Sequence, residues 1–483
     1  MRKFTFISIY LILSLCISLL SSCKESSSIN QSNLELNQSD PWDQLPDILN
    51  KITLPTFPDA QYNVLEYGAV KDDGKDDTDA FRKAINACTE KGGGMVVVPA
   101  GIYHSSAIHL KSNVNFHIQE GAEILFSTNP ADYPMVSTAY EGIECINYSP
   151  LIYAYKQTNI AVTGKGILNG QASNENWWIW KGNKEYGWSE GMPNQKDSTS
   201  LPRLMSSQDN GIKVEDRIYG KGHYLRPTFI EPNTCEKILI QGITIKNAPF
   251  WVIHPFKSKF ITVDGVTVDS HGPNNDGCNP EYSKYVLIKN STFNTGDDCI
   301  AIKSGRDADG RRVGIKSENI VVQNCKMIDG HGGVVIGSEA SSGVRNIFVE
   351  NCNMDSPNLD RAIRIKTNSR RGGVIENIYV RNLEVGQVKE CVLKLNMFYG
   401  IYANQSGDFV PTIRNIHLEN INVKNGGEYG ILAKGHPDSP ITDVYLTNVT
   451  VEKVDSPYSI ENVNNIHFSN TTFNGKKADD PKI

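Results

Sequence analysis

The chain has 483 residues, of which 39% are hydrophobic, and it carries a formal net charge of −6 at pH 7. This content is enough for a large buried core. At the usual domain size a chain of this length would form two or three domains, unless it is built from repeats. The negative charge argues against a nucleic-acid partner, and it means that an acidic substrate would need positive charge concentrated at its site.

The first 22 residues are predicted to be an export signal. Arg2 and Lys3 precede an apolar run over residues 4–20 that is too short and too close to the terminus for a membrane-spanning helix. The run ends in small residues before Cys23, which resembles the lipobox of bacterial lipoproteins, whose cysteine becomes the acylated N-terminus. We therefore expect an exported protein that is anchored by lipid on Cys23 to the outer membrane, on its periplasmic or cell-surface face.

Residues 23–56 are rich in Ser, Asn and Gln, which predicts a flexible tether between this anchor and a folded domain over residues 57–480. The eight cysteines that follow Cys23 are compatible with disulfides in an oxidising compartment, but the sequence does not fix their pairing.

A helix is predicted over residues 78–90, with Thr78 as its N-cap and apolar residues at helical spacing. Three glycines end it at residues 92–94, before the strand sequence MVVVP. We expect this helix to cap the open end of a solenoid, because a terminal repeat must shield the core from water and from edge pairing.

A short phrase recurs down the second half of the chain. Two β-forming residues alternate with polar residues, a Gly or Asn follows, and a second alternating pair completes the phrase, as in ITVDGVTV and IFVENCNM. The central residues of the copies are Gly164, Gly242, Gly265, Asn290, Asn324, Asn351, Asn382, Asn420, Asn448 and Asn470. From Gly242 onward they lie 22 to 38 residues apart, which fits one solenoid coil with loops of variable length.

The alternation places Val, Ile, Leu and Phe inside and Lys, Glu, Thr and His outside, which predicts a parallel β-helix. The central Asn or Gly suits a bend that needs left-handed backbone or a stacked amide ladder. A leucine-rich repeat is disfavoured because β-branched residues dominate, and a propeller would need more uniform periods.

Four motifs in the repeats combine chemistry-bearing residues. They are Asn274-Asn275-Asp276, Gly296-Asp297-Asp298, Gly330-His331-Gly332 and Arg364-Ile365-Lys366. Asp276 and Asp298 are 22 residues apart, and His331 lies 33 residues from both Asp298 and Arg364, each about one coil. Because equivalent residues of adjacent coils are roughly 4.8 Å apart, we expect all four motifs on one face.

The carboxylates of this face suit glycoside hydrolysis. An inverting reaction needs a protonated acid at the leaving oxygen and a carboxylate base that holds water, roughly 6.5 to 9.5 Å away. Clustered carboxylates repel, so one of Asp276, Asp297 and Asp298 should keep its proton to higher pH and act as the acid. Adjacent Asp297 and Asp298 would face opposite sides of a regular strand, which predicts a turn or bulge at Gly296.

Arg364 and Lys366 should point the same way from one strand, with Ile365 in the core, and could hold the carboxylate of a sugar acid. Further cations supply local positive charge nearby: Lys303, Arg306, Arg311, Arg312, Lys316, Lys326, Arg345, Arg361, Arg370 and Arg371.

These motifs resemble glycoside hydrolase family 28, the polygalacturonases, whose pattern is Asn-Thr-Asp, Gly-Asp-Asp, Gly-His-Gly and Arg-Ile-Lys. Asn275 replaces the family's Thr, and the other three motifs match. The resemblance covers nearly all of the mature chain and implies an all-β fold, a single-stranded right-handed parallel β-helix of the pectin-lyase-like type. It implies hydrolysis of α-1,4-galacturonosyl bonds in pectin with inversion, without cofactor or metal, by a monomer that acts on an acidic polysaccharide or oligosaccharide.

The resemblance also implies two groups of site residues. The catalytic residues are Asp276, Asp297, Asp298 and His331. The substrate-binding residues are Asn274, Arg364, Lys366 and Tyr399. In these roles Asp297 is the general acid, Asp276 and Asp298 position the attacking water, and His331 tunes the acid.

Alternatives remain open on the sequence alone. The nearest alternative is a rhamnogalacturonan or other uronan hydrolase of the same family. A pectate lyase is a second alternative, which would need a calcium site and a base for the C5 proton. Outside enzymes, the alternative is a non-catalytic β-helical adhesin. The stretch 185–226 precedes the regular coils and is expected to form long loops that wall off one end of the cleft. Such a wall would favour attack at chain ends.

Overall fold

The computed structural model describes residues 40–400 and 407–481. Contacts divide the chain into a unit that ends at Asp43 and a compact unit that begins at Gln44, and the fold below is that of the second unit. The predicted signal peptide over 1–22, the predicted lipid anchor Cys23 and the predicted tether as far as residue 39 lie outside the described residues. None of the helices in residues 40–400 and 407–481 is long and apolar enough to span a bilayer.

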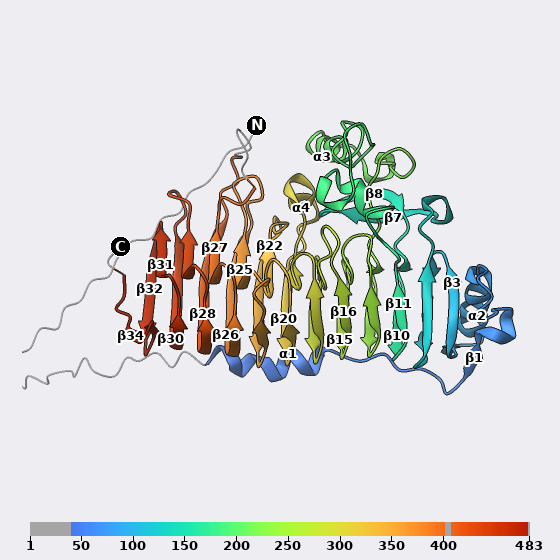
Figure 1. The fold of residues 1–483 in the computed structure, drawn as a ribbon, viewed down its shortest axis with the longest axis horizontal. Coiled ribbons are helices and arrows are strands. Elements are labelled where there is room, and N and C mark those ends of the chain that lie inside the picture. The colour runs from blue at the N-terminus through green and yellow to red at the C-terminus, as the bar shows by residue number, and fades with distance from the viewer. Residues whose placement is uncertain (1–39, 401–406, 482–483) are drawn as a thin grey trace, which may run out of the picture. The chain divides into compact units, whose positions relative to one another are not determined.

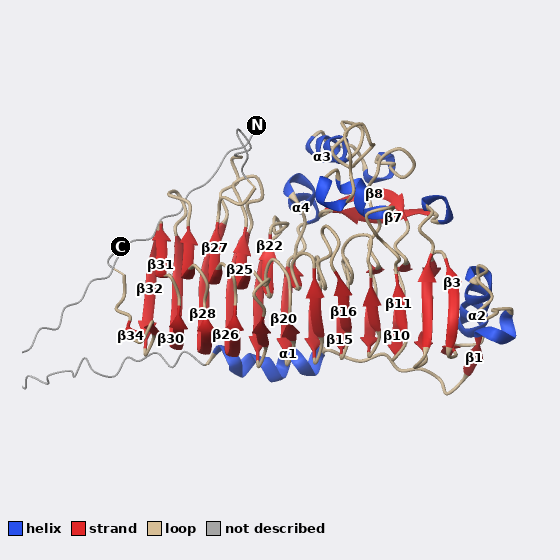
Figure 2. Ribbon diagram, in the orientation of Figure 1, coloured by secondary structure: helices blue, strands red, loops and turns tan. Residues whose placement is uncertain are grey.

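Short parallel strands stack into three rows, as the recurring phrase predicts (Figures 1 and 2). Most coils contribute one strand to each row, so residues one coil apart become hydrogen-bonded neighbours. The first row holds β1 (Gln61–Asn63), β2 (Gly94–Val98), β5 (Val114–Ile118), β10 (Thr158–Gly164), β13 (Glu236–Gln241), β15 (Lys259–Asp264), β17 (Lys284–Lys289), β20 (Ser317–Gln323), β23 (Val344–Glu350), β26 (Val374–Gln387), β28 (Thr412–Asn425), β30 (Ile441–Lys453) and β32 (Val463–Ser469).

The other two rows complete each coil. The second holds β3 (Gly101–Ser105), β6 (Ala122–Phe126), β11 (Ile167–Asn169), β14 (Thr244–Lys246), β16 (Thr267–Ser270), β18 (Thr292–Thr295), β21 (Lys326–Met327), β24 (Asn353–Asp355), the ends of β26, β28 and β30, and β33 (Thr472–Phe473) with the antiparallel β34 (Lys476–Lys477). The third holds β4 (Ile108–His109), β9 (Ile152–Tyr155), β12 (Ile230–Asn233), β19 (Ile300–Ile302), β22 (Val334–Gly337), β25 (Arg361–Lys366), β27 (Cys391–Asn396), β29 (Tyr429–Lys434) and β31 (Ser456–Glu461). Isolated bridges through residues 253 and 278 link β12 to β19.

Aliphatic side chains stack inside the solenoid from coil to coil. In the first row Ile238, Ile261, Val286, Ile320 and Ile347 pair in this order, and each is at most 2% exposed. Complete burial of one such side chain contributes about 1.5–3 kcal/mol, so the repeated inward positions are the main source of stability.

The asparagines at the coil bends form the expected amide ladder. Their φ angles lie between 48° and 55° from Asn290 to Asn470, and asparagine occupies this left-handed region more easily than most residues. The Nδ2 of Asn420 donates to Oδ1 of Asn382 at 3.3 Å, and the Nδ2 of Asn448 donates to Oδ1 of Asn420 at 3.0 Å. One residue type therefore satisfies both the backbone bend and the stacking between coils.

A second amide ladder runs near the start of the first-row strands, and the sequence analysis does not identify it. The Nδ2 of Asn346 donates to Asn319 at 3.1 Å, that of Asn377 to Asn346 at 3.0 Å, and that of Asn415 to Asn377 at 2.7 Å. These residues also have positive φ. The available signal is an Asn directly before the first apolar residue in four successive repeats.

The predicted capping helix is α2 (Thr78–Glu90), which buries Phe81 and Ile85 against the first coils. Its N-cap is Asp77 rather than the expected Thr78, and the Asp77 side chain makes no capping hydrogen bond. Its Oδ1 accepts instead from the backbone N–H of Val70 at 2.8 Å, which ties the start of the helix to the preceding turn.

The assignment of residues as far as 56 to a flexible tether is wrong for the last part of that stretch. α1 (Leu45–Lys51) follows the 3₁₀ helix η1 (Pro41–Gln44), and it packs beside β17 with Leu45 and Ile48 buried. The cause is an apolar pair at helical spacing, which the polar composition of the surrounding residues hid. The folded unit therefore begins before residue 57.

A covering layer lies over the third row, where Figures 1 and 2 show β7, β8, α3 and α4 together. It contains the antiparallel hairpin β7 (Met135–Tyr140) and β8 (Ile143–Tyr148), α3 (Leu201–Asp209), α4 (Asp307–Val313) and the 3₁₀ helices η4 (Trp177–Lys181), η5 (Lys184–Tyr186) and η6 (Val214–Asp216). Leu204, Tyr140 and Phe250 belong to its separate apolar core. The expected loops of 185–226 therefore include an α-helix. Two further 3₁₀ helices, η2 (Val64–Tyr67) and η3 (Pro130–Asp132), lie near the N-terminal coils.

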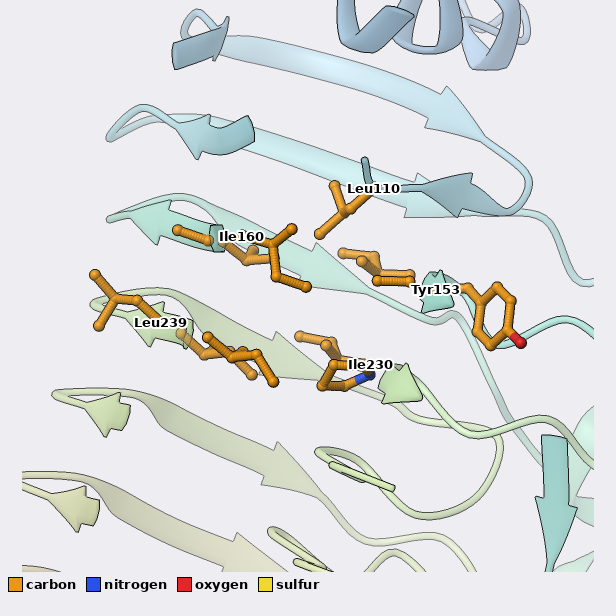
Figure 3. A pocket seen from close by; sticks show the side chains of 12 residues that line it. Leu110, Tyr153, Ile160, Ile230 and Leu239 are labelled. Carbon is orange, nitrogen blue, oxygen red and sulfur yellow. The ribbon is translucent and has the colours of Figure 1, made fainter. Parts of the chain in front are cut away.

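The interior of the solenoid is too closely packed to bind a sugar. Figure 3 shows Leu110, Ile160 and Ile230 around a cavity of about 10 Å³, room for a single water at most. All eight cysteines in the described residues are buried free thiols rather than disulfides.

Candidate active site

The third row gathers the sequence motifs, although not in the register that equal spacing suggests. Cys278 pairs with Ile300, 22 residues on, which aligns Asp276 with Asp298 as predicted. The next offsets are 34 residues, from Ile300 to Val334, and 29 residues, from Val335 to Arg364. His331 therefore lies beside Asp297, and the backbone N–H of His331 donates to the backbone oxygen of Asp297 at 3.0 Å. Arg364 pairs with Val335, so it lies four residues further along the coil than a spacing of 33 from His331 implies.

The chain bends between β18 and β19, as the adjacent aspartates require. Residues 296–299 belong to neither strand, so Asp297 and Asp298 need not face opposite sides. A Cβ on Gly296 would lie 2.5 Å from the backbone oxygen of Gly272, which means that only glycine fits there. The Oδ1 of Asp297 accepts from the backbone N–H of Asp298 at 3.0 Å and fixes the bend.

Asp276 lines the cleft and is almost completely buried, at 3% exposure. Its Oδ2 accepts from Asn279 Nδ2 at 2.7 Å and lies 3.4 Å from Lys303 Nζ. Burial raises the pKa of Asp276 to about 8, assisted by the neighbouring charges of Asp297 and Asp298 and opposed by Lys303. Asp276 is therefore the carboxyl of the group that keeps its proton in the free site.

Asp297 is the most exposed of the three carboxyls and contacts His331. Its Oδ1 lies 3.1 Å from His331 Nδ1. Burial acts to raise the pKa of Asp297, but the hydrogen bond and charge of His331 and the charges of Lys366 and Lys181 outweigh it and hold the pKa well below its usual value. The same hydrogen bond raises the pKa of His331 to about 8. The residue that the resemblance assigns as the acid is thus ionised when the site is empty.

Asp298 is completely buried and neutralised by cations from a coil further along. Its Oδ2 lies 2.6 Å from Lys366 Nζ, and its Oδ1 lies 3.5 Å from Arg364 Nη1. Both cations project from β25 on the same side, as predicted, while Ile365 is buried in the core. The ring of Tyr399 lies 5.2 Å from the guanidinium carbon of Arg364 and 5.0 Å from Lys366 Nζ, so Tyr399 belongs to the same end of the site.

Asn274 adopts a φ of 56° and supports the other end of the site. Its Oδ1 accepts from Arg226 Nη2 at 2.9 Å and from Lys181 Nζ at 2.7 Å. Asn275, which replaces the family's Thr, is buried, and its amide binds backbone groups of Gly272, Ala248 and Phe250. Asn275 therefore stabilises the loop through these hydrogen bonds, and its presence does not displace Asp276 from the site.

Most of these side chains line a cleft of about 460 Å³ between the third row and the covering layer, whereas Asp298 and Arg364 are buried beside it and are not part of its lining. Its lining includes the predicted Asn274, Asp276, Asp297, His331, Lys366 and Tyr399 together with Glu141, Lys181, Gln195, Lys196, Trp251, Lys303, Arg306, Asp307, Glu339, Arg370 and Arg371. Several of the lysines and arginines in this lining are expected from the sequence only as local positive charge. The contacts made by Lys181, Asn279, Arg226 and Glu339 are not predicted. Asn279, three residues after Asp276, is the one with a readable signal, since it lies beside a catalytic motif.

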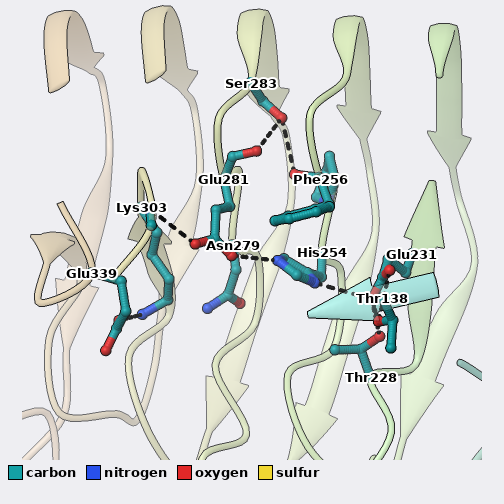
Figure 4. A network of polar contacts seen from close by, with 12 residues as sticks. Thr138, Thr228, Glu231, His254, Phe256, Asn279, Glu281, Ser283, Lys303 and Glu339 are labelled. Carbon is teal, nitrogen blue, oxygen red and sulfur yellow. Dashed lines mark hydrogen bonds and ion pairs between the residues drawn. The ribbon is translucent and has the colours of Figure 1, made fainter. Parts of the chain in front are cut away.

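A row of buried polar residues lies beside the cleft (Figure 4). His254 is fully buried, with Nδ1 3.3 Å from Glu231 and Nε2 2.9 Å from Glu281. Thr138 of the hairpin donates to Glu231 at 2.8 Å, and Lys303 Nζ lies 3.0 Å from Glu339. This row connects the covering layer to the coils that hold the acids.

The sequence matches known proteins over the same region. The model for glycosyl hydrolases family 28 matches residues 213–472, and a model for rhamnogalacturonase A/epimerase, pectate lyase-like proteins matches residues 61–118. The chain belongs to glycosyl hydrolase family 28. All eight site residues that the sequence analysis assigned lie within the first match, whereas Lys181 lies outside both.

Relatives of this family 28 hydrolase cover most of its length. A probable polygalacturonase of Vitis vinifera is 27% identical over 403 residues, 80% of this chain and 74% of that protein. An exo-poly-alpha-D-galacturonosidase of Dickeya chrysanthemi is 26% identical over 453 residues, 86% of this chain and 71% of that protein. The crystal structure of a hyperthermoactive exopolygalacturonase from Thermotoga maritima has a TM-score of 0.83 and 40% identity, and the match covers 90% of this chain and 98% of that one. The predicted enzyme class and the predicted right-handed parallel β-helix are confirmed.

Proposed function

We propose that this enzyme hydrolyses α-1,4-galacturonosyl bonds of polygalacturonate and pectin with inversion, acting from a chain end. The observation that carries the proposal is one cleft lined by Asp276 and Asp297, with Asp298 buried beside them and lysines and arginines around them, because a polyuronate needs acids for glycosidic cleavage and cations for its own carboxylates.

Asp297 is the proposed acid because its carboxyl faces the cleft and is the least buried of the three, at 18% side-chain exposure. In the empty site nearby cations keep it ionised. A bound uronate carboxylate would offset the charges of Lys181 and Lys366 and so raise the pKa of Asp297, although the hydrogen bond and charge of His331 would still oppose its protonation. Asp276 would position the attacking water and Asp298 would accept its proton, with Asn279 and Lys366 fixing the orientations of the two carboxyls.

The covering layer supports attack at chain ends. η4, η5 and α3 belong to an insertion before the regular coils, and Lys181, Lys196 and Met205 of this insertion line the cleft. Two of the relatives named above, the Dickeya and Thermotoga proteins, are described as exo-acting.

The test is a time course of products from polygalacturonate. We expect one short saturated product to accumulate from the first minutes while the polymer stays long. Early release of mixed oligomers would reject attack at chain ends, an unsaturated uronide would indicate a lyase, and cleavage of rhamnogalacturonan alone would indicate the other activity in the family.

A further inference from the structure

The cations of the cleft differ in whether a carboxylate already neutralises them. Lys303 lies 3.0 Å from Glu339, Arg306 2.6 Å from Glu141, Arg371 2.5 Å from Asp307, and Lys366 2.6 Å from Asp298. Lys181 has no carboxylate oxygen within 4.0 Å of its Nζ among the described residues, and its hydrogen bond goes to the neutral Oδ1 of Asn274 at 2.7 Å. Lys196 has no carboxylate partner there either, but it donates to Gly182 O and Asn183 Oδ1 and so fastens its own loop.

Lys181 is held rigidly at the end of η4. Trp177 of this helix is 1% exposed, with its ring centroid 4.8 Å from that of Trp180, and Trp178 Nε1 donates to Ala248 O at 2.9 Å. The helix ends at Gly182, where a Cβ would lie 2.4 Å from Asn194 Oδ1. A lysine in such a frame loses little further entropy when it binds a ligand.

The position of Lys181 is costly without an anion. Burial lowers the pKa of its ammonium, and the nearest compensating charges are those of Glu141 and Asp297. A half-buried cation that faces an open cleft without a paired carboxylate is suited to bind the carboxylate of a ligand.

Lys181 and the pair Arg364 and Lys366 contact different parts of the catalytic site. Lys181 contacts Asn274, two residues before Asp276, whereas Arg364 belongs to the third coil after it. The charged groups of Arg364 and Lys366 reach back to Asp298, one coil after Asp276, so the two groups of cations contact adjacent coils of the site. A galacturonan carries one carboxylate on each sugar, so the two sugars that flank the cleaved bond need separate cations.

We propose that Lys181 determines specificity by binding the carboxylate of the non-reducing sugar at the cleaved bond, because it contacts Asn274, two residues before Asp276, and Asp276 would position the water that attacks that sugar. This inference rests on the proposed galacturonan hydrolysis. Lys181, which lies outside both family-model matches, would then determine whether the enzyme prefers a free carboxylate or a methyl ester on that sugar.

The test compares digalacturonate with its two monomethyl esters, one on the non-reducing and one on the reducing sugar, as substrates of the full enzyme. For the native enzyme, we expect the ester on the non-reducing sugar to lower kcat/KM about 10- to 100-fold, the range for a hydrogen bond to a charged group. In Lys181→Met that penalty should fall to within about twofold, because the ammonium that discriminates is gone, while the penalty for the reducing-sugar ester should persist.

Two variants serve as controls. Lys184→Met removes the same charge from an exposed site in the same segment and should keep both penalties. Lys181→Arg should restore discrimination against the non-reducing ester. The inference is wrong if Lys181→Met keeps the native penalty for that ester. Failure of the native enzyme to cleave digalacturonate or polygalacturonate would instead reject the proposed function, and a thermal melt of each variant separates either result from unfolding.

Discussion

Asp276 and Asp297 are the same residue type within one cleft, yet their surroundings give them different proton affinities. Asp276 is buried beside one lysine and an amide and keeps its proton to higher pH, whereas Asp297 is held ionised by His331 and two lysines. The sequence predicts the three acids and the repulsion among them. It does not predict which acid keeps the proton, because that depends on contacts with the side chains of Lys303, Lys181 and Asn279, none of which belongs to a motif.

Asp297→Asn tests the proposed acid. Because asparagine cannot donate the proton, we expect kcat on polygalacturonate to fall about 10²- to 10⁴-fold, with a far-ultraviolet spectrum and melting temperature close to those of the native enzyme. Asp329→Asn is the matched control, since its half-buried carboxyl accepts from Ser356 outside the cleft lining. Equal activity of Asp297→Asn and the native enzyme would contradict the role.

His254→Gln tests the buried row as a source of pH-dependent stability. Burial opposes the charged imidazole, but Glu231 and Glu281 raise the pKa of His254 to about 9, above the ordinary 6.5. A raised folded-state pKa contributes stability that is fully present below pH 6.5 and lost as the pH rises through 9, on the order of 3 kcal/mol.

The measurement is the melting temperature of both proteins between pH 6 and pH 9.5. The native protein should lose more stability over this range than His254→Gln does, since glutamine carries no titrating proton. Parallel decline of the two melting temperatures would mean that His254 contributes no such stability.

At the scale of elements, local sequence patterns predict the strands and bends that recur in every coil. They do not predict helices that occur only once. The alternating phrase predicts the first-row and second-row strands and the Asn ladder because each copy repeats the same requirement. α1 and α3 have no repeats to reveal them, and their apolar residues pack against the solenoid or the hairpin only in three dimensions. The unequal coil lengths also shift Arg364 relative to His331, a change of register that residue counting cannot supply.

Substitutions at Asn420 separate the two contributions of the Asn ladder. Asn420→Ala keeps the Cβ at a φ of 54° but loses the polar side chain that makes this backbone tolerable for asparagine, and it removes the side-chain hydrogen bonds to Asn382 and from Asn448, so we expect a loss of about 2–4 kcal/mol in the free energy of unfolding. Asn420→Gly removes the hydrogen bonds without the strain and should lose about 1 kcal/mol less. Denaturant titration measures both, and a glycine variant that is no more stable than the alanine variant would contradict the strain component.

For the whole molecule, the stacking of coils converts motifs far apart in the sequence into one site. Four coils supply Asp276, the Asp297–Asp298 pair, His331 and the Arg364–Lys366 pair, and an insertion before the regular coils closes over them. This arrangement explains how a chain with a net charge of −6 can suit a polyanion, because its cations face one cleft.

The N-terminus carries a separate prediction. We propose that Cys23 is acylated and holds the enzyme at the outer membrane. On expression in a bacterium that processes lipoproteins, the native protein should partition with membranes and into detergent, whereas Cys23→Ser should become aqueous while keeping its activity. Equal partition of the two proteins would reject the anchor.

The most direct test of the shared cleft is proton NMR of trigalacturonate during the first turnovers, which resolves the anomer released before mutarotation. The account predicts that the newly formed reducing end is the β-anomer, as inversion of an α-linkage requires, and that Asp297→Asn forms it at least a hundred times more slowly. First appearance of the α-anomer, or an undiminished rate in the variant, would contradict inverting hydrolysis by these aspartates.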